Sequence, residues 1–363
     1  MTEDELKNQF GNYERTVWIV NSIHGHLLKY YRDVLDCFDR FPKFPLTGGE
    51  FLTPDFAASF HSGFDIVAEI KRALGSNDVS LNETYEQICK YDQSLKFRRS
   101  PEGSHERTSK SHDIALFTNL EYAAKEAKRL RELIRSNSRP KRPVIIFSDT
   151  FDAQQTKPRW IFSCLTEFSD RFSDGGLPEE RRLSKRHQED RESIVIYANE
   201  FAGIQAQHPF CNDDPPAVYT AVLLWAKVFP NLIPPDKLAD WTLEENNQGT
   251  VEFSVTIGAL ISERDRQRLA IRKQQVIDAL SLLEAGKVVM RTNTEIIIRY
   301  RRFRATFGDE RDEEKAIEAA IDHTKHGLIR EISRGMSKAA PKKTRIVRPR
   351  KATKDDNQGL LNL

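Results

Sequence analysis

The sequence predicts an α/β protein in which a central mixed sheet is flanked by helices, followed by a smaller α+β domain. Through the first half of the chain, short apolar runs of strand length alternate with longer segments of helical periodicity. Three prolines within residues 230–237 then interrupt this pattern. Beyond them a helix, a glycine and two strand-like runs follow one another, which indicates a second folding unit.

Composition favours a protein of the cytoplasm and excludes several function classes. The chain has 363 residues, of which 39% are hydrophobic, and its formal net charge is only +2, so local patches decide which partners it binds. Its four cysteines show no CxxC spacing, which argues against a zinc finger or a disulfide scaffold. The polar N-terminus and the lack of a long apolar run predict no signal peptide and no membrane partner. The chain also has no Walker or GxGxxG motif.

The N-terminal elements can be assigned from periodicity and turn signals. Residues 12–40 carry apolar side chains at helical spacing and predict one helix. Residues 48–60 and 65–73 predict two strands joined by a tight His-Ser-Gly turn. Residues 82–95 predict a helix with Asn82 as its N-cap. The polar segment 97–112 lacks periodicity and is expected to be a loop.

The elements that follow continue the alternation of strand and helix. Residues 169–192 are highly charged and predict either an exposed helix or an insertion. The expected strands are 113–118, 142–151, 158–165 and 193–201, and the expected helices are 120–136 and 217–229.

Three motifs that suit phosphodiester hydrolysis fall close together. Asp55 lies in the first strand of the hairpin, and Glu69 and Lys71 lie in the second, fourteen residues later. Because Glu69 and Lys71 are two residues apart, their side chains leave the same face of the strand. Gln87 and Tyr91 are four apart on the next helix and share one of its faces.

These residue types match what the reaction requires. A hard cation such as Mg²⁺, for which Mn²⁺ can substitute, prefers carboxylate oxygens and activates water. We therefore expect Asp55, Glu69 and the carbonyl of Ile70 to be metal ligands. The Lys71 ammonium would help to deprotonate the water or stabilise the transition state. The competing interpretation is a solvated strand edge that carries incidental charges.

The set resembles the PD-(D/E)xK nuclease superfamily, and the Gln87/Tyr91 pair resembles the QxxxY motif of its RecB-like branch. The resemblance covers roughly residues 12–165 and implies a restriction-endonuclease-like core. It implies metal ligation by Asp55 and Glu69, catalysis by Lys71, and an auxiliary role for the QxxxY pair. Many members add an acidic residue from the first helix. Candidates for it here are Glu14, Asp33 and Asp36, with Glu50 a weaker one.

The C-terminal half resembles a winged helix-turn-helix. The stretch from residue 251 starts with a possible strand, 272–286 predict a helix that ends at Gly286, and 287–291 and 295–301 predict two strands. The residues expected to contact DNA are Arg272, Lys273, Gln274 and Gln275 on the helix and Arg291, Arg299, Arg301, Arg302 and Arg304 on the wing. An α+β subdomain for dimerisation, with ordinary solvated charges, is the alternative.

The end of the chain is predicted to be one helix and a basic tail. Residues 311–334 predict the helix. Residues 338–354 contain eight Lys or Arg and no acid, which favours a disordered segment that holds nucleic acid nonspecifically or merely aids solubility.

Together these patterns predict four regions and one activity. The regions are a nuclease core (1–168), a charged insertion with a linking strand and helix (169–240), a winged-helix-like or assembly domain (241–335) and the basic tail (336–363). The expected function is a Mg²⁺-dependent DNA nuclease. The resemblance further suggests microbial defence or restriction as its setting, with a homo-oligomer or other defence subunits as partners. The alternatives are a DNA-binding or scaffold protein that retains the nuclease fold, and an RNA-cleaving nuclease.

Overall fold

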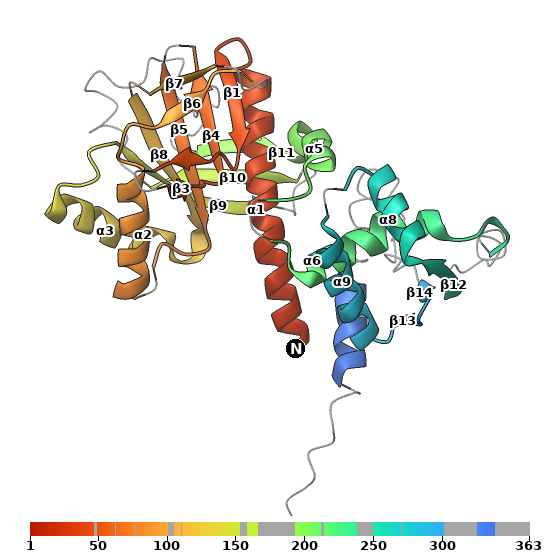
Figure 1. Cartoon of the computed structure of the whole chain (residues 1–363). Helices are drawn as coiled ribbons and strands as arrows, with labels where there is room; N and C mark the ends of the chain where they lie inside the picture. Colours follow the sequence, from red (N-terminus) through yellow and green to blue (C-terminus); the bar gives the residue numbers. More distant parts are fainter. Residues whose placement is uncertain are drawn as a thin grey trace, which may run out of the picture.

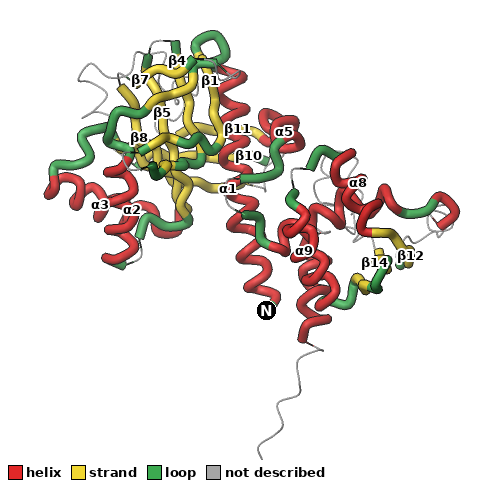
Figure 2. The backbone as a smooth tube through the Cα atoms, in the orientation of Figure 1, coloured by secondary structure: helices red, strands yellow, loops and turns green. Residues whose placement is uncertain are grey.

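The computed structural model has a seven-stranded mixed sheet with helices on both faces and a smaller three-stranded antiparallel sheet near the C-terminus (Figures 1 and 2). The α/β class is therefore confirmed. The charged segment 169–192, residues 311–324 of the last predicted helix and residues 338–363 of the basic tail lie outside the described residues, whereas residues 336 and 337 are helical. The described residues are 1–46, 49–61, 63–75, 77–100, 105–109, 111–152, 158–165, 193–211, 214–237, 250–269, 271–300 and 325–337.

The first helix is longer at its start and shorter at its end than the sequence predicts. Helix α1 spans Glu3–Tyr30, and the Thr2 hydroxyl caps it by accepting from the Glu5 backbone N–H. The prediction that the helix continues to residue 40 is wrong, because Leu35–Arg40 form strand β1. Its apolar residues continue the helical spacing by chance, and periodicity alone does not separate a short strand from a last helical turn.

The large sheet follows chain order almost without exception. Its strand order is β1-β4-β5-β8-β9-β10-β11. β5 pairs with β8 and β8 with β9 in parallel, while every other neighbour is antiparallel. The strands not yet bounded are β4 Phe56–Phe60, β5 Phe64–Lys71, β8 Ser111–Asn119, β9 Val144–Asp152, β10 Arg159–Cys164 and β11 Ser193–Tyr197.

Helices cover both faces of this sheet, so the strand β5 is buried on both sides. The second half of α1 and helix α5, Ala198–Gln207, pack on one face. Helices α2, Asp78–Lys90, and α3, Leu120–Asn137, pack on the other. The face of β5 that bears Glu69 is also packed, because α2 and α3 lie over it.

Helix α2 begins earlier than expected. Its N-cap is Asn77, whose side chain accepts from the Ser80 N–H at 2.9 Å, so the assignment of Asn82 as the cap is wrong. Just before it, Gly75 has φ +151° and lies so close to α2 that an added Cβ would be 2.5 Å from the Leu81 backbone. Only glycine permits this turn, which brings α2 back across the end of β5.

Two smaller hairpins replace parts that the sequence assigned otherwise. Lys96–Arg98 (β6) pairs with Glu106–Thr108 (β7), and β8 begins at Ser111, so the prediction that 97–112 is a loop is wrong for most of its described residues. The expected strand 48–60 is divided at Pro54, which lacks the N–H a sheet interior needs. Its first part, β3 Phe51–Leu52, pairs with β2 Phe44–Pro45.

Several later predictions are confirmed with small changes. Strands at 113–118, 142–151 and 158–165 and the helix at 120–136 are present. The run 193–201 is a strand only as far as Tyr197, where α5 follows. The buried helix at 217–229 is α6, Ala217–Leu223, which continues as a π-helical turn, Leu224–Val228, and a 3₁₀ turn, Phe229–Leu232.

The C-terminal module has its own three-stranded sheet, in the order β12-β14-β13. Residues 325–337 form a further helix. The hydrophobic core of the C-terminal module includes the first half of α1, because Leu6, Phe10 and Val17 belong to the same buried cluster as the module's apolar side chains. The elements of the module are β12 Val251–Thr256, α8 Ile257–Arg266, α9 Lys273–Ala285, β13 Val289–Arg291 and β14 Glu295–Tyr300.

The helix 325–337 contacts α9 through two glycines. A Cβ on Gly335 would lie 2.1 Å from the Gly286 carbonyl oxygen, and one on Gly286 would lie 2.8 Å from the Ile332 Cα. Backbones approach this closely only where neither residue has a side chain. Among the described residues, no helix is long and apolar enough to span a membrane.

Candidate active site

The predicted site lies where the three parallel strands end. Lys71 at the end of β5 is in register with Thr118 of β8, and Thr118 with Ser148 of β9. Asp55 directly precedes β4, and its backbone N–H donates to the Ala68 carbonyl at 3.0 Å, which places it beside the last residues of β5. In open α/β sheets, the carboxyl ends of the strands are the usual place for ligands.

Glu69 is the centre of this group. Its side chain is almost fully buried, with 5% of the residue exposed. The Tyr91 hydroxyl donates to its Oε1, and the Lys71 Nζ lies 3.6 Å from its Oε2. The strand alternation that placed Glu69 and Lys71 on one face is thereby confirmed.

The QxxxY pair completes the arrangement from the next helix. Lys71 donates through Nζ to the Gln87 Oε1 at 2.6 Å. Tyr91 is the C-cap residue of α2. The Lys71 side chain is 28% exposed, so its ammonium reaches solvent while its partners hold it in place. Gln87 and Tyr91 also line a groove of about 710 Å³ between α2 and β3.

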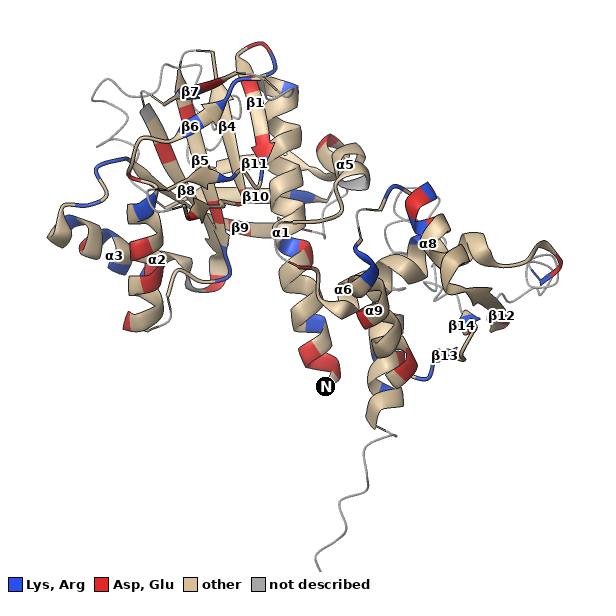
Figure 3. Ribbon diagram, in the orientation of Figure 1, with Lys and Arg blue, Asp and Glu red and all other residues tan. Residues whose placement is uncertain are grey.

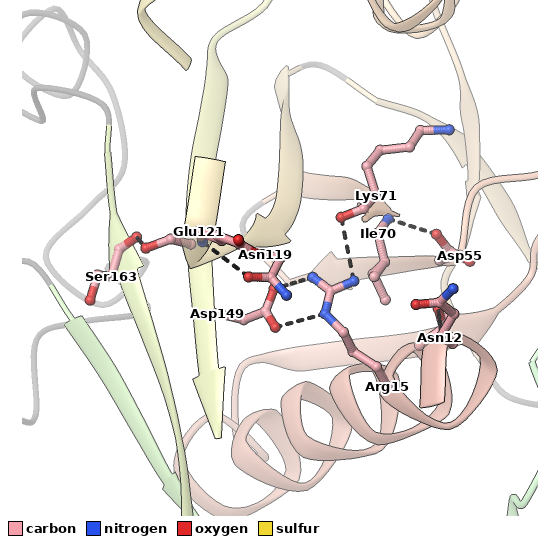
Figure 4. Close-up of polar contacts among 11 residues, drawn as sticks. Asn12, Arg15, Asp55, Ile70, Lys71, Asn119, Glu121, Asp149 and Ser163 are labelled. Carbon is pink, nitrogen blue, oxygen red and sulfur yellow. Dashed lines mark hydrogen bonds and ion pairs between the residues drawn. The ribbon is translucent and has the colours of Figure 1, made fainter. Parts of the chain in front are cut away.

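Asp55 is fixed by the backbone of the second strand. Its Oδ2 accepts from the Ile70 N–H at 2.7 Å, as Figure 4 shows. The peptide that links Glu69 to Lys71 through Ile70 therefore also orients the Asp55 carboxylate. The Ile70 peptide is thus linked to both predicted carboxylate residues, to Asp55 by this hydrogen bond and to Glu69 as its neighbour in the chain.

Burial determines the proton affinity of these groups. It raises the pKa of Glu69 above its usual value, while Lys71, the Tyr91 hydroxyl and Gln87 act in the opposite direction. Burial and the nearby Glu69 charge raise the pKa of Tyr91. The phenol therefore keeps its proton and remains a donor to Glu69.

Sequence reasoning missed an ion pair beside the site. Arg15 of α1 donates through Nε to the Asp149 Oδ2 at 2.9 Å, and its NH1 donates to the Lys71 carbonyl at 3.4 Å (Figure 4). Asp149 lies in β9, one residue beyond Ser148, and burial raises its pKa while Arg15 lowers it. Its place after the apolar run of β9 was a usable signal, but nothing in the sequence singled out Arg15.

Two of the candidate acids, Glu14 and Asp36, form ion pairs with cations outside the predicted site. Glu14 forms an ion pair with Lys325. Asp36 lies in β1 and pairs with Arg99, which in turn binds Asp65 at the other end of β5. Asp65 and Lys71 are six residues apart, or about 20 Å along a strand.

The other two candidates lie in exposed segments. Asp33 is exposed in the turn after α1, and Glu50 is exposed just before β3. The α1 side chain that does reach the strand ends is the cation Arg15.

The donor set suits a hard cation that keeps part of its water shell. Among the described residues, no group of three or more Asp, Glu, His or Cys could hold a metal ion. Two carboxylates and a carbonyl are what Mg²⁺ takes from many proteins, with water filling the rest. The buried Glu69 carboxylate, whose pKa burial raises, is a charge that a bound cation would offset.

The predicted DNA contacts of the C-terminal module are mostly paired with acids. Arg272 pairs with Asp214, while Lys273 and Gln274 are exposed at the start of α9. The Gln275 carboxamide oxygen accepts from the Arg272 backbone N–H at 2.9 Å and so caps the helix. Figure 3 accordingly shows both charge signs on this module.

The wing arginines are also partnered where they are described. Arg291 binds Glu284 and Arg299 binds Glu252, each through Nε at 2.8 Å. Arg301, Arg302 and Arg304 lie outside the described residues. The described part of the wing therefore presents no uninterrupted basic surface.

Comparison with known proteins gives no relative for this chain. No family model matches it, and neither a curated protein nor a solved structure matches it.

Proposed function

We propose that this chain is a Mg²⁺-dependent DNA nuclease that hydrolyses phosphodiester bonds, with Mn²⁺ able to substitute. The proposal rests on one observation. The side chains that the sequence singled out for this reaction, from separate segments of the chain, are connected by hydrogen bonds and an ion pair. Glu69 contacts Tyr91 and Lys71, and Lys71 contacts Gln87. Asp55 binds the peptide between Glu69 and Lys71.

Asp55, Glu69 and the Ile70 carbonyl would hold the cation. When bound, it supplies charge neutralisation at the phosphoryl oxygens and an activated water. The Tyr91 hydroxyl orients Glu69 and favours its ionised form, because it donates to the carboxylate and opposes the rise in pKa that burial causes. The Ile70 N–H does the same positioning for Asp55.

Lys71 supplies positive charge where negative charge develops in the transition state. Its ammonium is held between Glu69 and Gln87, so little reorganisation is needed when the substrate arrives. Arg15 fixes the strand end from the opposite face, since it binds both the Lys71 carbonyl and Asp149. The site is thus preorganised by contacts from α1, α2, β5 and β9.

The C-terminal module fits a winged-helix arrangement. Two helices lie between its first and second strands, and the third strand pairs with both others. Its contacts to DNA would come first from Lys273, because the nearby arginines and Gln274 are held by carboxylates. Exposed ion pairs are weak, so phosphate can compete for those arginines at low salt.

The test is a cleavage panel. Wild-type protein is incubated with plasmid, linear DNA, single-stranded DNA and RNA, with Mg²⁺ or EDTA, beside the variants Asp55→Asn, Glu69→Gln and Lys71→Ala. We expect cleavage of DNA that needs Mg²⁺ and falls by at least about 100-fold in each variant. Equal cleavage by all three variants and wild type would contradict the proposal.

A metal titration separates the enzyme from a scaffold that retains the fold. Calorimetric binding of Mg²⁺ or Mn²⁺ that is lost in Glu69→Gln supports the enzyme. A folded protein that neither binds the cations nor cleaves DNA supports the scaffold. Cleavage of RNA alone would keep the site and change the substrate class.

A further inference from the structure

A second cavity lies next to the proposed active site, on the α1 face of the sheet. Its volume is about 540 Å³, within the range of small-molecule pockets. It lies between α1, the start of α3 and the ends of β9 and β10. Arg15 and Asp149, the ion pair at the strand ends, both line it.

Three aromatic rings form one wall of this cavity, which we call the aromatic pocket. Trp18 lies edge to face with Phe151, with ring centroids 5.2 Å apart, and Trp160 lies 5.2 Å from Phe151. Trp18 and Phe151 are only partly buried, so their rings are accessible from the cavity. Aromatic side chains at such a place bind planar rings by stacking or edge-to-face contact.

The charges around the aromatic pocket nearly cancel. Asp149 is neutralised by Arg15, and Glu14 by Lys325, whose ammonium also lies 5.2 Å from the Trp18 ring centroid. Glu121 adds one further exposed acid to the lining. The further acid disfavours a phosphate here, whereas a neutral ring with polar edges meets both donors and acceptors.

Arg15 connects the aromatic pocket to the active site. Its guanidinium contacts the Lys71 carbonyl on one side and Asp149 in the pocket on the other. Arg15 is therefore shared by the two places, because it binds the strand end that carries Lys71 and also lines the aromatic pocket.

We propose that the aromatic pocket takes an unpaired nucleobase of the strand that is cut. The inference rests on the proposed nuclease function and narrows its substrate class to single-stranded or locally opened DNA. A base in a continuous duplex is stacked and paired, so it cannot enter a side pocket without leaving the helix.

The test is binding in EDTA, where no cleavage occurs. The probes are a labelled short single strand, the same strand with every base removed, and the matching duplex, each followed by fluorescence anisotropy. The full-length wild type is compared with Phe151→Leu, which keeps apolar volume but loses the ring. Phe38→Leu is the matched control, since Phe38 is also partly buried but stacks on His24, away from the pocket.

We expect wild type to bind the base-bearing single strand about 5- to 150-fold more tightly than the abasic strand. Phe151→Leu should lose most of this preference and Phe38→Leu should keep it, with urea unfolding confirming that both are folded. Equal binding of the two strands by wild type, or an undiminished preference in Phe151→Leu, would overturn the inference.

The two proposals can fail separately. Cleavage of DNA without any base preference would leave the nuclease standing and remove the aromatic pocket from it. A base preference that depends on Phe151 in a protein that cuts nothing would keep the pocket and remove the nuclease.

Discussion

Replacing Tyr91 with Phe should move the acid limb of the activity profile to higher pH. The Tyr91 ring is 1% exposed and stays packed in the variant, so only the hydroxyl that donates to Glu69 is lost. That hydrogen bond lowers the pKa of Glu69, which burial raises. Its loss therefore lets Glu69 take up a proton at a higher pH than in wild type.

The size of the shift follows from the strength of the bond. A hydrogen bond to a charged group contributes about 1.5–3 kcal/mol. One pKa unit corresponds to about 1.4 kcal/mol. The acid limb of kcat/KM for DNA cleavage should therefore move upward by about one to two pH units.

The assay is the pH dependence of kcat/KM with Mg²⁺ for wild type, Tyr91→Phe and Tyr85→Phe. Tyr85 is the matched control because it is a buried tyrosine of the same helix that makes no contact with Glu69. An acid limb in Tyr91→Phe that coincides with those of wild type and the control would refute the reasoning.

Stability gives an independent check with a definite sign. An acid whose pKa is raised by folding costs stability above that pKa, and the cost disappears as falling pH protonates the group. Loss of the Tyr91 donor should therefore destabilise the variant by about 1–3 kcal/mol at high pH, once Glu69 has lost its proton. The difference from wild type in urea unfolding should narrow as the pH falls; a constant difference would contradict the hydrogen bond to an ionised Glu69.

Two further predictions concern the scaffold. Burial lowers the pKa of His112 to about 4, so the protein should lose stability as the pH falls from about 6.5 to 4, by about 3 kcal/mol at pH 4. In urea unfolding, the free energy of His112→Asn should depend less on pH than that of wild type. Identical pH dependence of the two proteins would refute this. Gly335→Ala places a Cβ against the Gly286 carbonyl and should lower the free energy of unfolding in urea by about 1–3 kcal/mol. Gly203→Ala is the control, because Gly203 has open space around it and its replacement should not lower stability. Equal effects of the two variants would contradict the close backbone contact.

The hairpin and the side on which its candidate site residues lie were readable from sequence because they depend on local rules. Alternation places Glu69 and Lys71 on one face, and a four-residue spacing places Gln87 and Tyr91 on one side of α2. The structure joins these two local patterns through the bonds of Glu69 and Lys71.

Contacts between residues far apart in the chain could not be predicted from the sequence, because they depend on how separate elements pack. Arg15 and Asp149 are 134 residues apart, and only the packing of α1 against the strand ends brings them together. Similarly, the change from α1 to β1 after Tyr30 depends on pairing with β4, which leaves no local mark in an apolar run. The aromatic pocket needs α1, α3, β9 and β10 at once, so no single segment reveals it.

The central claim is that Lys71 and its bonded neighbours form one hydrolytic site, and a single rate tests it most directly. The single-turnover rate of Mg²⁺-dependent DNA cleavage is measured for wild type, Lys71→Met and Lys96→Met, in which Lys96 is an exposed lysine of β6. We predict that Lys71→Met lowers the rate by at least about 100-fold while Lys96→Met leaves it near that of wild type. A Lys71→Met protein that is folded and cleaves as fast as wild type would contradict the claim.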